Sequence, residues 1–147
     1  MIREMFRRMF RNGQVAVASS SNASVRRGTW GENVAAAHLR RIGWRIVGRN
    51  VRPCKSDRRC ELDIVAYVPG ERQVVFVEVK TLPHGDVAML EQVLGKIKRK
   101  RIIETAKYFI HTVRQYSNSY MRFDVLIVDM PGLPPLYHIE NAFSENS

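Results

Sequence analysis

The spacing of apolar residues predicts a helix near the start of the folded part of the chain. Apolar side chains recur three and four positions apart over residues 34–42, as they do along one face of a helix. Thr29 and Glu32 precede them at the spacing of a capping box, and Gly43 follows them. We therefore expect a helix that begins at Thr29 and ends near residue 41.

A longer helical pattern and five strand patterns complete the predicted elements. The helical pattern runs over residues 86–113, with Asp86 as its cap and Gly95 as a weak point. The strand patterns are short runs rich in β-branched residues, the last of them an edge strand. They cover residues 44–47, 61–68, 73–80, 122–129 and 136–139. Helix, three strands, helix and strand in this order, followed by the edge strand, predict an α/β domain on a mixed sheet.

The two ends of the chain differ from this domain in composition. Residues 1–27 are basic, rich in Ser and Asn toward their end, and have no period that could bury a core face, so we expect a flexible arm. Such an acid-poor, Arg-rich segment also fits an organelle transit peptide. We place the domain at residues 28–143 and a short tail at residues 144–147.

The predicted hairpin brings acidic residues together across two strands. A two-residue turn at residues 70–71 gives cross-strand partners whose numbers add up to 141. Asp63 then lies opposite Glu78, and Glu61 opposite Lys80. A three-residue loop would shift this register by one.

An opposed pair of carboxylates has two interpretations. One is a set of cross-strand ion pairs that includes Lys80, because charged residues are common on a solvated strand face. The other is a metal site, because the run Val-Val-Phe-Val before Glu78 is typical of a central strand, where two neighbouring acids repel and are costly to bury. An all-oxygen site suits Mg²⁺ or Mn²⁺ better than zinc.

Charge and composition narrow the classes of partner. The 147 residues carry 24 Lys and Arg against 14 Asp and Glu, a net charge of +10. This balance favours an anionic partner, nucleic acid before others, although a basic chain that is merely soluble is the plainer alternative. No apolar run approaches the roughly 20 residues that cross a bilayer, so we expect a cytoplasmic protein without membrane contact. The histidines are scattered singly, and we assign them no chemistry.

Several motifs together resemble a known family. Their order and spacing are similar to those of the YraN family of bacterial proteins, within the PD-(D/E)XK or restriction-endonuclease-like superfamily that also includes archaeal Holliday-junction resolvases. Cys60 and Leu82 depart from the family pattern, where a glycine and a basic residue are usual. The matching motifs are Gly31-Glu32, Glu61-Leu62-Asp63, Phe76-Val77-Glu78-Val79-Lys80, Lys98, Ala106, Arg122-Phe123-Asp124-Val125 and Asn141-Ala142-Phe143.

This resemblance implies a restriction-endonuclease-like mixed central sheet flanked by helices, and it implies roles for individual residues. Asp63, Glu78 and the carbonyl of Val79 would hold Mg²⁺ or Mn²⁺, and Lys80 would act beside them in catalysis. Glu32 would complete the catalytic site, although its place in a capping box is an equally good explanation. A group of basic residues would line a groove for the nucleic-acid backbone, or else form a solvated helix face. The group consists of Lys96, Lys98, Lys100 and Arg101.

Three functions are compatible with these observations. The first is a metal-dependent endonuclease acting on structured or branched DNA, and the analogy extends to a homodimer because resolvase-like folds commonly act as dimers on two-fold junctions. The second is a protein that binds nucleic acid without cleaving it. The third is an adaptor that recruits a partner through the arm and the acidic C-terminal stretch. The presence of Asp63, Glu78 and Lys80 together favours the enzyme.

Overall fold

The computed structural model describes residues 21–54, 61–81, 94–129 and 135–146, without the side chains of residues 21–27. Within these ranges, no helix is long and apolar enough to cross a membrane. The helices are α2 (Ser21–Arg41), α4 (Lys96–Thr112) and a 3₁₀ turn (Arg114–Tyr116). The strands are β1 (Arg45–Val51), β2 (Leu62–Val68), β3 (Gln73–Lys80), β4 (Tyr120–Val128) and β5 (Leu136–Phe143).

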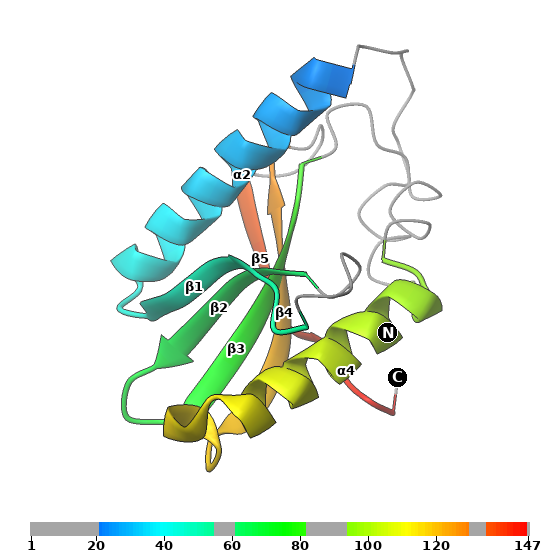
Figure 1. Cartoon of the computed structure of the whole chain (residues 1–147). Coiled ribbons are helices and arrows are strands. Elements are labelled where there is room, and N and C mark those ends of the chain that lie inside the picture. The colour runs from blue at the N-terminus through cyan, green and yellow to red at the C-terminus, as the bar shows by residue number, and fades with distance from the viewer. Residues whose placement is uncertain (1–20, 55–60, 82–93, 130–134, 147) are drawn as a thin grey trace.

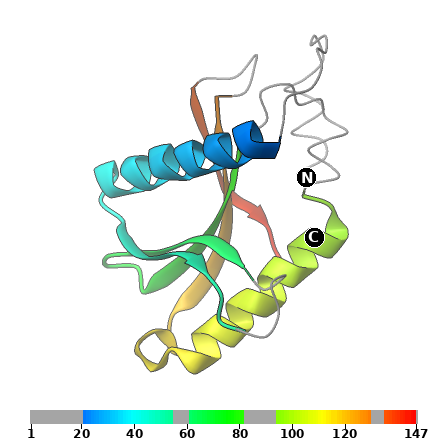
Figure 2. The ribbon, with the colours of Figure 1, turned by 45° about the horizontal axis from the view of Figure 1, so that its top comes forward.

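The five strands form one mixed sheet with a helix on each face (Figure 1). Their spatial order is β1-β2-β3-β4-β5, and only the β3–β4 pair is parallel among them. A parallel pair needs a long crossover, and the crossover here includes α4. Figure 2 shows α2 and α4 on opposite sides of the sheet. The predicted α/β fold with a mixed sheet flanked by helices is confirmed.

Each face of the sheet has its own apolar core. On one face, Ala35, Ala36 and Leu39 of α2 pack against β2, β3 and β4. On the other, buried residues of α4 such as Ala106 and Phe109 pack against the same strands and β5. The run Val-Val-Phe-Val at the start of β3 is buried throughout, as expected of a strand covered on both sides.

The helix boundaries differ from the expected ones. The prediction that the first helix begins at Thr29 is wrong, because α2 already includes residues 21–28. Residues 1–20 of the expected arm lie outside the described residues, and residues 21–27 belong to α2. The second helix is shorter than its pattern: Gly95, with an extended backbone, is its N-cap, and the expected cap Asp86 lies outside the described residues.

The β2–β3 hairpin has the predicted register but a different turn. Partners from Ile64–Val77 to Val68–Gln73 have numbers that add up to 141. The loop contains four residues rather than two: the Glu71 N–H donates to the carbonyl of Val68 over 3.3 Å, and Gly70 sits third in that turn with φ +84°. Proline second and a positive φ third are typical of a type II turn. Because the loop is lengthened equally on both sides, the register is unchanged.

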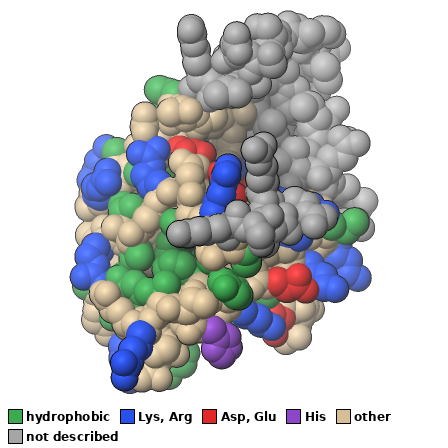
Figure 3. All heavy atoms as spheres, viewed as in Figure 1, with side chains coloured by type: hydrophobic (Ala, Val, Ile, Leu, Met, Phe, Trp, Pro, Cys, Tyr) green, Lys and Arg blue, Asp and Glu red, His purple; other side chains and the backbone are tan. Residues whose placement is uncertain are grey.

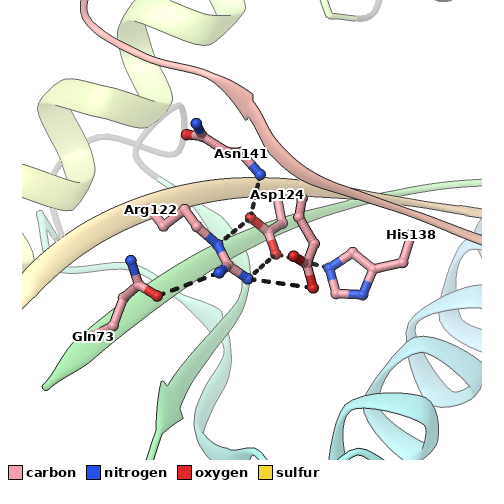
Figure 4. A network of polar contacts seen from close by, with 6 residues as sticks. Gln73, Arg122, Asp124, His138 and Asn141 are labelled. Atoms are coloured by element: carbon pink, nitrogen blue, oxygen red, sulfur yellow. Dashed lines mark hydrogen bonds and ion pairs between the residues drawn. The ribbon is translucent and has the colours of Figure 1, made fainter. Parts of the chain in front are cut away.

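A buried polar network holds β5 against β4 (Figure 4). Asp124 on β4 is fully buried and accepts hydrogen bonds from Arg122 Nε at 2.9 Å and Nη2 at 2.8 Å. The backbone N–H of Asn141 donates to it over 2.9 Å, and its Oδ2 lies 2.8 Å from Nε2 of His138. Burial alone would raise the pKa of Asp124, but the hydrogen bonds from His138 and Arg122 hold it below its usual value. Asp124 lies at the β4–β5 register shift between Phe123 and Val125, so these contacts join the two strands at that irregularity.

We predict that Asp124→Ala destabilises the fold by about 3 kcal/mol, because it leaves the mostly buried Arg122 without its carboxylate. Urea denaturation at pH 7 measures this change. Asp124→Asn should lose less, since it keeps one acceptor oxygen. Glu140→Ala is the control. Glu140 lies 3.9 Å from the same guanidinium but is exposed, so its loss should change the stability little. A wild-type midpoint for Asp124→Ala would contradict a structural role for the network.

Candidate functional site

The ends of β2 and β3 bring Asp63 and Glu78 together. The hydrogen-bonded ladder ends at the pair Ile64–Val77, so the same register carries Asp63 to the position across from Glu78. The N–H of Val79 donates to Oδ2 of Asp63 over 2.9 Å. The side chain of Glu78 is only 4% exposed. Two predicted site residues thus lie beside each other in a partly desolvated place.

The protonation of Asp63 reflects this setting. Burial raises the pKa of Asp63 to about 7, and the carboxylates of Glu78 and, more weakly, Glu32 act in the same direction. Lys80 and the N–H of Val79 act against them. Near neutral pH, a further cation at Asp63 would therefore favour the ionised carboxylate. The site has an electrostatic demand for positive charge.

Two ammonium groups reach Glu78 from different elements. Nζ of Lys80, on the same strand, donates to Oε1 of Glu78 over 2.8 Å. Nζ of Lys98, from the first turn of α4, is 3.7 Å from the same oxygen. The side chain of Lys80 is 13% exposed and that of Lys98 is 37% exposed. Lys80 and Glu78 thus form an ion pair within β3 rather than the expected cross-strand pair, while Asp63 has no lysine so close among the described residues.

Glu32 is held by side chains of β1. Nδ2 of Asn50 donates to its Oε2 over 3.2 Å, and Nη2 of Arg49 lies 3.8 Å from the same oxygen. Because α2 does not start at Thr29, the capping-box explanation of Glu32 is wrong. Sequence reasoning missed Arg49 and Asn50 because the predicted strand stopped at residue 47. A predicted strand that continued to residue 51, where β1 ends, would have included both residues.

A close approach of α2 to the end of β3 positions Glu32. A Cβ atom on Gly31 would lie 2.0 Å from Oγ1 and 3.3 Å from Cβ of Thr81, directly after β3. Glycine therefore lets the helix backbone lie against this residue. The dipeptide Gly31-Glu32 combines a contact point for the helix with an acid next to it.

The other predicted residues are more widely distributed. Glu61 does not lie against Lys80 but pairs with Arg52, whose Nε donates to it over 2.6 Å. Arg101 is exposed on α4. Lys96 and Lys100 line a groove that does not include Lys98. The structure thus divides the predicted basic group between different sides of α4.

The residues at the strand ends fit a hard divalent cation. Within the described ranges, no three His, Cys, Asp or Glu side chains are grouped as a complete metal cage. Mg²⁺, however, usually binds through one or two carboxylates and leaves its other positions to water and substrate phosphate. Asp63, which has a demand for positive charge, and Glu78 supply such a pair. The carbonyl of Val79 belongs to the residue whose N–H already contacts Asp63.

We predict that Asp63→Asn is more stable than wild type in the presence of a chelator. The pKa of Asp63 is raised in the folded state, so its contribution to stability is retained below pH 4 and is lost as the pH rises through about 7. The advantage of the variant should therefore grow between pH 4 and pH 8, to about 1–3 kcal/mol. Thermal or urea denaturation across this range measures it.

Glu61→Gln provides the matched control for this measurement. It removes a carboxylate from the same region whose partner is the exposed Arg52, so its effect should stay below about 1 kcal/mol. If Asp63→Asn were less stable than wild type at pH 8 in chelator, Asp63 would be a structural ion-pair residue.

Comparisons with known proteins agree on one family. The model of "Uncharacterised protein family UPF0102" matches residues 31–128. A UPF0102 protein of Treponema pallidum is 42% identical over 122 residues, which cover 80% of this chain and 92% of the relative. Those of Porphyromonas gingivalis and Pelobacter propionicus are 40% and 37% identical, covering 80% and 79% of this chain and 83% and 81% of the relatives. The chain belongs to the UPF0102 (YraN) family, of the restriction-endonuclease-like superfamily.

Proposed function

We propose that this protein is a metal-dependent endonuclease that hydrolyses phosphodiester bonds in structured or branched DNA. The observation that carries the proposal is the pairing of Asp63 and Glu78 at the ends of β2 and β3, with Lys80 bonded to Glu78. A surface that only bound phosphate would be better served without buried acids, because they repel the ligand. The acids therefore favour chemistry over binding alone.

Asp63, Glu78 and the carbonyl of Val79 would hold Mg²⁺ or Mn²⁺. When bound, the metal would polarise a phosphate oxygen and lower the pKa of a water molecule. Each ligand comes from the rigid end of a strand, which suits a site that must keep its geometry.

The protein's own cations would act on the phosphate and the attacking water. Lys80 is held by Glu78 and is mostly buried, so it can orient a water molecule or offset negative charge that grows on the phosphate. Lys98 is more exposed, and its Nζ lies 3.7 Å from the same Oε1 of Glu78. It can therefore reach a phosphate that approaches from solvent. Glu32 faces the pair from α2 and adds negative charge near Asp63.

DNA is the proposed substrate because the chain carries a large positive charge and phosphodiester chemistry suits this site. The second candidate, a protein that binds nucleic acid without cleaving it, would show affinity and no products. The same experiment therefore separates the two candidates.

We predict that purified protein cleaves at least one member of a panel of single-stranded, duplex, flap and four-way-junction DNA with Mg²⁺ or Mn²⁺, and none with a chelator. Asp63→Asn, Glu78→Gln and Lys80→Ala should each abolish cleavage while DNA binding survives, because affinity comes mainly from other cations. Gel analysis of end-labelled DNA gives the products. Glu61→Gln should cleave like wild type.

Two results would contradict the proposal. Cleavage that persists in all three variants would place the chemistry elsewhere in the chain. Binding without cleavage of any member of the panel under every metal condition would support the non-catalytic candidate.

A further inference from the structure

A groove of about 290 Å³ lies between α4 and the segment that follows β5. Both views of the ribbon place the C-terminal end of the chain beside the first half of α4 (Figures 1 and 2). Figure 3 shows basic and acidic side chains next to one another on this part of the surface. Four of the lining side chains are cationic and two are carboxylates. They are Lys96, Arg99, Lys100 and Lys107, with Glu104 and Glu145.

This groove is separate from the carboxylate pair. At about 100° per residue, Lys98 lies on one flank of the buried stripe of α4, and Lys96, Lys100 and Lys107 lie toward the other. The order of the strands gives the same result. Glu78 is on β3, the segment carrying Glu145 follows β5, and β4 lies between those strands. The helix therefore presents cations on two sides.

The charges of the groove are only partly compensated. Lys107 forms an ion pair with Glu145 at one end. Nε of Arg99 is buried and has no hydrogen-bond partner in the part of the chain that the structure describes. A buried donor without an acceptor is costly and unusual in folded proteins. The Arg99 side chain as a whole is only partly buried and lines the groove, so the rest of its guanidinium is placed to bind a ligand there.

The chemistry of the lining selects the ligand. A lining with one guanidinium and three ammonium groups matches a phosphate, whose several oxygens accept hydrogen bonds from Arg in a fixed geometry and attract Lys as a point charge. With four cations and two carboxylates, the lining has a net charge of +2, which attracts an anion. Lys96, Arg99 and Lys100 form no ion pair within the described residues.

We propose that this groove binds a backbone phosphate of the nucleic acid, at a distance from the phosphate that lies at Asp63 and Glu78. The proposal depends on the proposed function for its ligand, nucleic acid, but not for cleavage. Contacts on both flanks of α4 would hold a strand across the helix and so fix which phosphate meets the carboxylates. Arg99 is the centre of the site.

The test is the salt dependence of DNA binding, measured by fluorescence anisotropy with labelled duplex and four-way-junction DNA in chelator. Arg99→Gln and Lys100→Gln should each weaken binding and flatten the slope of log K against log salt by about one unit, as expected for the loss of one phosphate contact. Arg99→Lys should keep most of the slope because it keeps the charge.

The matched control is Arg114→Gln, which removes an exposed cation of the 3₁₀ turn beyond the far end of α4. It changes the net charge equally but should leave the slope nearly unchanged. Lys100 is exposed, so Lys100→Gln keeps the test valid if Arg99→Gln does not fold. Melting temperatures check the folding of each variant.

The outcomes separate this proposal from the proposed function. If Arg99→Gln and Lys100→Gln behave like Arg114→Gln, or if wild type shows no salt-dependent DNA binding, the groove is not a phosphate site. Failure of the protein to cleave DNA would overturn the nuclease but not the groove, because the binding experiment contains no metal.

Discussion

Two carboxylates at the shared end of β2 and β3 create an electrostatic constraint that the surrounding elements satisfy only in part. The apolar run of β3 places Glu78 where its side chain is almost fully buried, and the hairpin register sets Asp63 across from it. Lys80 and Lys98 bring positive charge to Glu78 from β3 and α4. Asp63 accepts a hydrogen bond from one backbone N–H, while burial and the neighbouring Glu78 raise its pKa to about 7. A divalent cation would supply the positive charge that Asp63 lacks.

Two aspartates of the sheet, the fully buried Asp124 and the partly buried Asp63, have pKa values shifted in opposite directions. Asp124 accepts hydrogen bonds from two side chains and a backbone N–H, and these contacts hold its pKa below the usual value. Asp63 lies beside another carboxylate, and its pKa is raised. A fully satisfied acid stabilises the fold, whereas an acid left short of positive charge is typical of functional sites. The motif containing Arg122 and Asp124 is therefore structural, and the motif containing Asp63 is the candidate for chemistry.

Much of this arrangement is predictable from the sequence because it depends on local periodicity. The predicted hairpin register is correct although the predicted turn is not. The loop is longer than predicted by one residue on each side, so the cross-strand partners stay the same. The start of α2 was not predictable from Thr29 and Glu32, because residues three apart are also ordinary neighbours inside a helix. The contact of Lys98 with Glu78 joins segments far apart in sequence, so no local pattern shows its geometry. The same holds for Arg49 and Glu32.

Calorimetric titration of Mn²⁺ into the metal-free protein tests the central claim most directly, because it needs no substrate. Wild type should bind the ion, Glu61→Gln should bind it equally well, and Asp63→Asn should lose most of the affinity, since it removes one of the two anionic ligands that Asp63 and Glu78 would supply. Equal binding by wild type and Asp63→Asn, or no binding by wild type, would contradict a metal centre at this carboxylate pair.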